Sequence, residues 1–118
     1  MTIELPHPPA ALSPNGNRHH WGSVSLARKK CRQEAALITT QYMLHNTQPI
    51  GKQWKTYHVC WNYFGTVMPD DDNVVARIKS YKDGICDALG INDRSIHLGS
   101  VTFVHKKATK KKLWITLE

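Results

Sequence analysis

The sequence predicts an α+β fold in which one small mixed β-sheet packs with two main helices in a single domain. Two segments carry apolar residues every three or four positions, several short segments alternate apolar with polar residues, and no linker or internal repeat divides the chain. A length of 118 residues suits one domain, so we expect residues 1–118 to fold as one unit.

Two helices are expected in the middle of the chain. The first follows Ser25, a suitable N-cap, with apolar positions at Ala27, Cys31, Ala35, Ile38 and Tyr42. The second follows Asn73, with apolar positions at Val74, Ile78, Tyr81, Ile85 and Leu89. Gly90 then stands where a helix C-cap favours positive φ, and Gly84 inside the second helix indicates a close approach by another element.

Four strands are expected around these helices. Thr2–Leu5 is a short strand ended by prolines, and residues 54–64 alternate with Tyr57, Val59, Trp61 and Tyr63 on one face. Near the C-terminus, residues 101–104 and 113–117 also alternate. The polar stretch 106–112 joins them, which predicts a β-hairpin with a basic loop.

Composition narrows the possible functions. Lys and Arg total 16 against 9 Asp and Glu, a formal net charge of +7, which favours an anionic partner such as nucleic acid or an acidic membrane surface. No segment approaches the roughly 18 apolar residues of a membrane span, and the N-terminus lacks the layout of a secretory signal. The three cysteines are widely spaced, which indicates reduced core thiols rather than disulfides or zinc ligands.

An acidic run interrupts this basic chain. Asp70, Asp71 and Asp72 precede the second helix, and Asp93 follows it. An acidic pocket repels phosphate unless a divalent cation lies between them, so the run suggests metal-dependent chemistry on nucleic acid. In extended chain, Asp70 and Asp72 would point to the same side and could share one ion. The alternative is that the aspartates only start a helix, and that Asp93 is a turn residue.

Carboxylates without nearby cysteine favour Mg²⁺, with Mn²⁺ as a possible substitute, and such ions support phosphodiester hydrolysis. Lys79 lies about two turns into the second helix, where it could neutralise charge that develops on the phosphate. Asp83 and Asp87 are like charges four residues apart, so we expect a cationic neighbour for each, such as Lys79 or Lys82.

Basic residues outside the acidic run are candidates for sequence-independent phosphate contacts. They are Arg18, Lys29, Lys30, Arg77, Lys106, Lys107, Lys110, Lys111 and Lys112. Trp21 could stack on an unpaired base, although a tryptophan beside a loop is also a common packing anchor. For the lysines of 106–112, the alternative is a solubilising loop that protects an edge strand.

Taken together, Asp70-x-Asp72-Asn73, the helix containing Asp87-Ala88-Leu89, and Gly90-Ile91-Asn92-Asp93 resemble the RusA family of Holliday-junction endodeoxyribonucleases of bacteria and their phages. The early loop 13–18 and the C-terminal strands fit the same resemblance. The resemblance implies a Mg²⁺-dependent homodimer, in the cytoplasm of a bacterial or phage-infected cell, that nicks two strands of a four-way DNA junction symmetrically. The family's three essential aspartates would fall on Asp70, Asp72 and Asp93.

The chain departs from the family pattern in two places. The family's typical member has a lysine where this chain has Ala76, so its role is assigned to Lys79, with Arg77 and Lys82 as rivals. The family often has two aspartates where this chain has Asn92 and Asp93, which leaves Asp93 as the ligand candidate. Two alternatives stay open: a non-catalytic module that binds branched DNA, and a nuclease that acts on other branched DNA.

Overall fold

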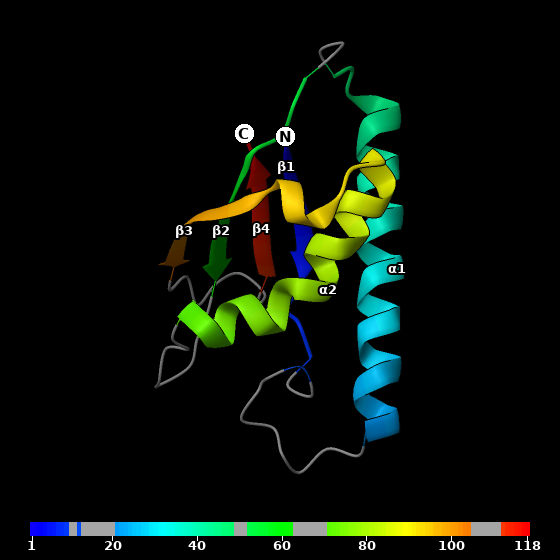
Figure 1. The fold of residues 1–118 in the computed structure, drawn as a ribbon, viewed down its shortest axis with the longest axis vertical. Coiled ribbons are helices and arrows are strands. Elements are labelled where there is room, and N and C mark those ends of the chain that lie inside the picture. Colours follow the sequence, from blue (N-terminus) through cyan, green and yellow to red (C-terminus); the bar gives the residue numbers. More distant parts are fainter. Residues whose placement is uncertain (10–11, 13–20, 49–51, 63–70, 105–111) are drawn as a thin grey trace.

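A computed structural model describes residues 1–9, 12, 21–48, 52–62, 71–104 and 112–118. In chain order the elements are β1 (Thr2–Pro6), α1 (Trp21–His45), β2 (Thr56–Asn62), α2 (Asp71–Leu89), the 3₁₀ helix η2 (Asp93–Ser95), β3 (His97–Val104) and β4 (Lys112–Leu117). Figure 1 shows α2 lying across one face of the sheet, with the long α1 upright beside it. The α+β prediction, with a mixed sheet and two helices, is confirmed.

The four strands form one sheet in the order β1-β4-β2-β3. β4 is antiparallel to both β1 and β2, whereas β3 runs parallel to β2. Parallel neighbours need a crossover connection, and α2 provides it between β2 and β3. Asp71 and Asp72 therefore open the crossover helix, and Asp93 follows it.

The core lies between the helices and one face of the sheet. Alternate residues of β2 are buried, which confirms the predicted face of Tyr57, Val59 and Trp61. The predicted apolar stripe of α2 is also buried at Val74, Ile78, Tyr81 and Ile85. Burying each such side chain contributes roughly 1.5 to 3 kcal/mol to folding.

The two helices approach each other closely at Gly84. A Cβ atom built on Gly84 would lie 2.2 Å from the backbone oxygen of Arg32 and 2.9 Å from Cβ of Ala35. Glycine is therefore needed for contact rather than for an unusual backbone angle. The predicted close approach is confirmed, and the approaching element is α1.

The C-terminal end of α2 reverses the chain direction. Gly90 has φ of +69°, as its C-cap position predicts, and its N–H donates to the oxygen of Asp87. The N–H of Ile91 donates to the oxygen of Cys86, which completes a Schellman motif. This turn leads residues 91–96 back along α2 before β3 begins.

Two sequence predictions about the elements are wrong. The strands of residues 101–104 and 113–117 do not form a hairpin, because β2 lies between β3 and β4. Alternating residues predict a strand but not its neighbours. The first helix begins at Trp21 rather than after Ser25, because no proline interrupts residues 21–24 and Val24 packs against the core. Among the described residues, no helix has the length and apolar character needed to cross a membrane.

Candidate metal and nucleic-acid site

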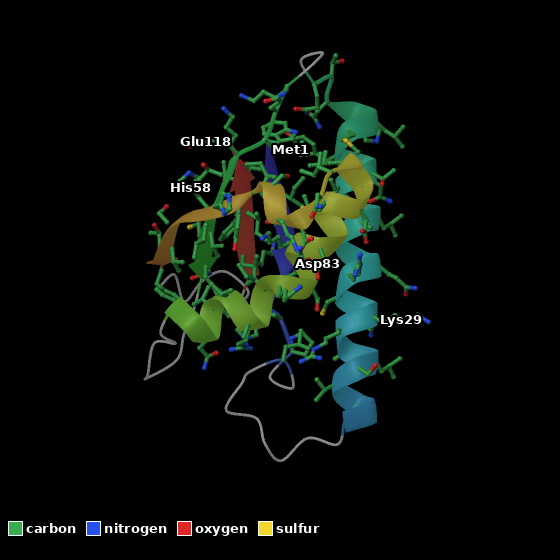
Figure 2. The ribbon with its side chains drawn as sticks, in the orientation of Figure 1. Met1, Lys29, His58, Asp83 and Glu118 are labelled. Atoms are coloured by element: carbon green, nitrogen blue, oxygen red, sulfur yellow. The ribbon has the colours of Figure 1, made fainter. Side chains whose placement is uncertain are left out.

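Asp93 lies in a polar pocket between the C-terminal half of α2, the middle of α1 and η2. The pocket has a volume of about 260 Å³, and its lining residues are Arg32, Lys79, Asp83, Cys86, Asp87, Ile91, Asn92 and Asp93. Three carboxylates and two cations therefore share one small space. Figure 2 labels Asp83, which lies where α2 faces α1.

Two ion pairs neutralise two of these carboxylates. Arg32 of α1 donates from Nε and Nη2 to the two carboxylate oxygens of Asp87, at 2.6 and 2.8 Å. Lys79 donates from Nζ to Oδ2 of Asp83 at 3.0 Å. The Arg32 hydrogen bonds hold the pKa of Asp87 below its ordinary value. Both aspartates thus have the cationic neighbours that their spacing predicts, although Arg32 was not among the residues expected.

Asp83 is the most buried of the charged residues in these two pairs. Its side chain is 15% exposed, and its Oδ1 atom is buried without a hydrogen-bond partner in the part of the chain that the structure describes. An unsatisfied buried carboxylate oxygen is unusual, and it leaves an acceptor in the pocket for a water molecule or a ligand.

Asp93 opens η2, and Asn92 fixes its position. The Oδ1 atom of Asn92 accepts a hydrogen bond from the N–H of Arg94 at 3.0 Å, which caps η2, and Ser95 Oγ donates to the backbone oxygen of Asn92. The asparagine that departs from the family pattern therefore has a structural role. Within the described residues, Asp93 has no side-chain hydrogen bond or ion pair, so its carboxylate is available to a ligand.

The predicted triad is described only in part. Asp70 lies outside the described residues, and Asp72 belongs to α2, which begins at Asp71. The expectation that Asp72 lies in extended chain is therefore wrong. Asp71 and Asp72 are the first two residues of the helix.

Asp93 lies opposite residues 83–87 rather than opposite the start of α2. Asp83 is eleven residues after Asp72, or about 16 Å along a helix that rises 1.5 Å per residue. Among the described residues, no group of three or more His, Cys, Asp or Glu is arranged to hold a metal ion. Lys79, in contrast, lines the same pocket as Asp93, with its side chain 63% exposed.

Arg77, a rival for the lysine role and a predicted nucleic-acid contact, is buried at 7% exposure. Its guanidinium lies 5.0 Å from the centre of the Trp61 ring and donates to the backbone oxygen of Pro8 at 2.7 Å. Lys82, the other rival, places its ammonium 5.1 Å from the ring of Tyr57. Both cations therefore contact core aromatic rings instead of the polar pocket.

The structure describes four of the remaining predicted nucleic-acid contacts and leaves five outside the described residues. Lys29 and Lys30 are exposed on α1, and Figure 2 shows Lys29 pointing away from the sheet, whereas Lys112 opens β4 and pairs with Glu4 at 3.2 Å. Trp21 is the first residue of α1 rather than a loop residue, and its side chain is not described. Outside the described residues lie Arg18, Lys106, Lys107, Lys110 and Lys111.

Sequence reasoning missed Arg32 and the pocket itself. The like charges of Asp83 and Asp87 were a signal that each needs a cation, but Arg32 is 55 positions from Asp87. Only the packing of α1 on α2 brings them together.

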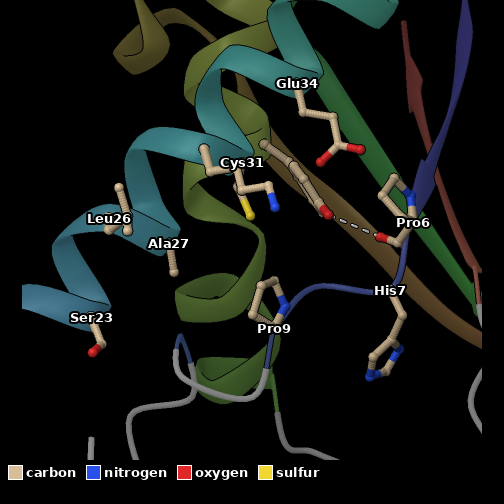
Figure 3. Close-up of a pocket in the computed structure, with 10 residues that line it drawn as sticks. Pro6, His7, Pro9, Ser23, Leu26, Ala27, Cys31 and Glu34 are labelled. Atoms are coloured by element: carbon tan, nitrogen blue, oxygen red, sulfur yellow. Dashed lines mark hydrogen bonds between the residues drawn. The ribbon is translucent and has the colours of Figure 1, made fainter. Parts of the chain in front are cut away.

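A second pocket lies on the other side of the α1–α2 contact. It has a volume of about 520 Å³ and is bounded by residues 6–9, the N-terminal half of α1 and Tyr81. Figure 3 shows Leu26, Ala27 and Cys31 on its α1 side, with the Tyr81 hydroxyl donating to the backbone oxygen of Pro6 at 3.0 Å. Its lining is mainly apolar and includes Lys30 and Glu34 as charged residues.

No protein-family model matches the sequence. The chain is 37% identical over 98 residues to a protein of Xylella fastidiosa, strain Temecula1, that is named only as an uncharacterized protein. The match covers 80% of this chain and 61% of that protein. The chain thus spans about three fifths of the relative's length, and the relative's name states no activity.

Proposed function

We propose that this chain is a Mg²⁺-dependent endodeoxyribonuclease of the RusA family. It acts as a homodimer on four-way DNA junctions and makes paired symmetric nicks during recombination and repair. The observation that carries the proposal is the polar pocket, in which Asp93 and Lys79 line one space while Asp83 and Asp87 are ion-paired. A free carboxylate beside a lysine suits a site that must hold a cation and a phosphate together.

The donor chemistry of the chain fits Mg²⁺ or Mn²⁺. Asp93 offers hard oxygen ligands in a polar pocket, and Asp70 and Asp72 would supply further carboxylates. When bound, such an ion neutralises phosphate charge and activates water. Lys79 has a flexible side chain that is 63% exposed, so it can turn from Asp83 toward a phosphate oxygen.

The overall charge supports a DNA substrate. A net charge of +7 attracts the polyanion, and the exposed Lys29 and Lys30 of α1 are available for phosphate contacts. These contacts would carry no sequence information. Junction binding should therefore weaken steeply as salt concentration rises.

The separation of Asp93 from Asp72 along α2 favours a site completed by two chains. In a two-fold dimer, Asp70 and Asp72 of one subunit can meet Asp93 of the other, and symmetry then produces two equivalent sites. Two such sites suit a junction, because paired nicks require two strands to be cut in the same way.

Mixing two inactive variants tests the proposal and this arrangement together. Asp72→Asn and Asp93→Asn should each fail to nick a synthetic four-way junction with Mg²⁺. Co-refolded as a mixed dimer, they should regain nicking in one strand, because one of the two shared sites then contains only native aspartates. A mixture that stays inactive would place the three aspartates within one chain, and normal cutting by either variant alone would contradict the nuclease proposal.

A non-catalytic module that binds branched DNA is the second candidate, because Ala76, where the family has its lysine, is exposed on α2. It predicts junction binding without a divalent ion and no nicking with Mg²⁺ or Mn²⁺. A nuclease for other branched DNA is distinguished by comparing flaps, three-way junctions and four-way junctions in one assay, with linear duplex as the control.

A further inference from the structure

The charges in the polar pocket do not balance. Arg32 and Lys79 face three carboxylates, so the pocket holds one excess negative charge. Asp87 is held by two hydrogen bonds from Arg32, and Asp83 by one from Lys79. The excess charge therefore falls on Asp93, the carboxylate without such a partner among the described residues.

Arg32 lines the same pocket as Asp83 and Asp93. Its side chain is 53% exposed, and its described side-chain hydrogen bonds are the two to Asp87. The charges of Asp83 and Asp93 also act on the guanidinium, although Asp87 is the main cause of the raised pKa of Arg32. Without Asp87, two cations would face two carboxylates, and the guanidinium would be free to pair with Asp93.

We infer that Asp87 is a positioning residue that holds Arg32 away from Asp93 and so keeps the Asp93 carboxylate free for a divalent cation. This inference rests on the proposed function, because it assigns Asp87 and Arg32 a role in metal binding at that site. The alternative is a purely structural ion pair, or brace, that only holds α1 against α2. A brace is lost equally when either partner is removed, whereas under our inference removing Asp87 frees a competing cation and removing Arg32 does not.

Three variants test this difference: Asp87→Asn, Arg32→Gln and the double variant. Arg28→Gln is the matched control, since it removes one positive charge from α1 at an exposed position outside the pocket lining. The direct readout is Mn²⁺ affinity, measured from the electron paramagnetic resonance signal of free Mn²⁺. Melting temperature and junction nicking are recorded on the same samples.

Asp87→Asn should weaken Mn²⁺ binding about tenfold, because the pocket loses its excess negative charge and Arg32 competes for the ligand. Arg32→Gln and Arg28→Gln should bind Mn²⁺ at least as tightly as the wild type. The double variant should return to within about twofold of the wild type, because its pocket again holds one excess negative charge.

Two results would overturn the inference while the nuclease proposal stands: native Mn²⁺ affinity in Asp87→Asn, or equal weakening in Asp87→Asn and Arg32→Gln. A wild-type protein that neither binds Mn²⁺ nor nicks junctions would overturn both. If Asp87→Asn melts much earlier than the other variants, the comparison of Arg32→Gln with the double variant decides, because a brace predicts weakened Mn²⁺ binding in both.

Discussion

The two pockets beside the α1–α2 contact differ in the residues that line them, and only one has the polar lining expected of a functional site. The apolar pocket is the larger, about 520 Å³ against about 260 Å³, yet its walls are mainly apolar side chains and prolines (Figure 3). The smaller pocket contains three carboxylates and two cations, with Asp93 left free. Chemistry depends on convergent polar groups rather than on volume, so the smaller pocket is the better candidate.

The largest expected effect comes from removing the free carboxylate. Asp93→Asn should lower Mg²⁺-dependent nicking of four-way junctions by about 100-fold or more, because the proposed metal ligand loses its charge. In the apolar pocket, Leu26→Ala should leave nicking within about twofold, since Leu26 is 67% exposed and does not line the polar pocket. Single-turnover nicking rates measure both. An equal loss in the two variants would remove the distinction between the pockets.

The contact that separates the two pockets should be sensitive to one added methyl group. Gly84→Ala would place a Cβ atom against the backbone oxygen of Arg32, so α1 and α2 must separate, at a cost of about 2 kcal/mol in the free energy of unfolding. Gly90→Ala is the comparison, because its φ of +69° creates backbone strain but no atom lies within 4 Å, and it should cost about 1 kcal/mol. Urea denaturation measures both. A Gly84→Ala protein as stable as the wild type would contradict the close packing.

Each pocket also contains one buried thiol, Cys31 in the apolar pocket and Cys86 in the polar one. Burial raises the pKa of both, and that of Cys86 reaches about 11 from an ordinary value of 9.0. The folded state therefore holds this proton more tightly than the unfolded state, and stability falls as pH rises from 9 to 11.

At pH 10 the loss attributable to Cys86 should be about 1 kcal/mol relative to neutral pH. Cys86→Ala should remove that part of the pH dependence, whereas Cys60→Ala, at a partly exposed position, serves as the control. Urea midpoints measured between pH 7 and 10 give the comparison. The same alkaline slope in both variants would count against the buried thiol as its cause.

The smallest expected effect is on stability in Arg32→Gln. Both partners of the ion pair with Asp87 are about half exposed, and pairs of this kind contribute less than about 1 kcal/mol. Thermal unfolding should therefore change little, even though the pair controls the charge of the polar pocket. A loss comparable to that of Gly84→Ala would show that the pair braces the helices.

Much of the fold follows from local patterns in the sequence. The alternation around Val59, the helical stripe from Val74 to Ile85 and the positive φ of Gly90 are each set by neighbours in the chain. Gly84 indicated a close approach, but the element that makes it, α1, is remote in sequence. The strand order was missed, because β3 and β4 can each pair with β2 and alternation does not reveal which edge a strand takes. The placement of Arg77 against Trp61 was missed for the same reason, since its partners are remote in sequence.

By itself, the sequence determined the α+β class, the basic charge and the presence of aspartates on both sides of the second helix. These depend on composition, periodicity and order, which need no knowledge of long-range contacts. Only the tertiary structure decided that Asp93 returns to the C-terminal half of α2 and that Arg32 of α1 neutralises Asp87. The reason is that the Schellman turn after α2 and the contact at Gly84 fix where remote segments of the chain meet. Electrostatic interactions between those segments depend on the distance between their charges.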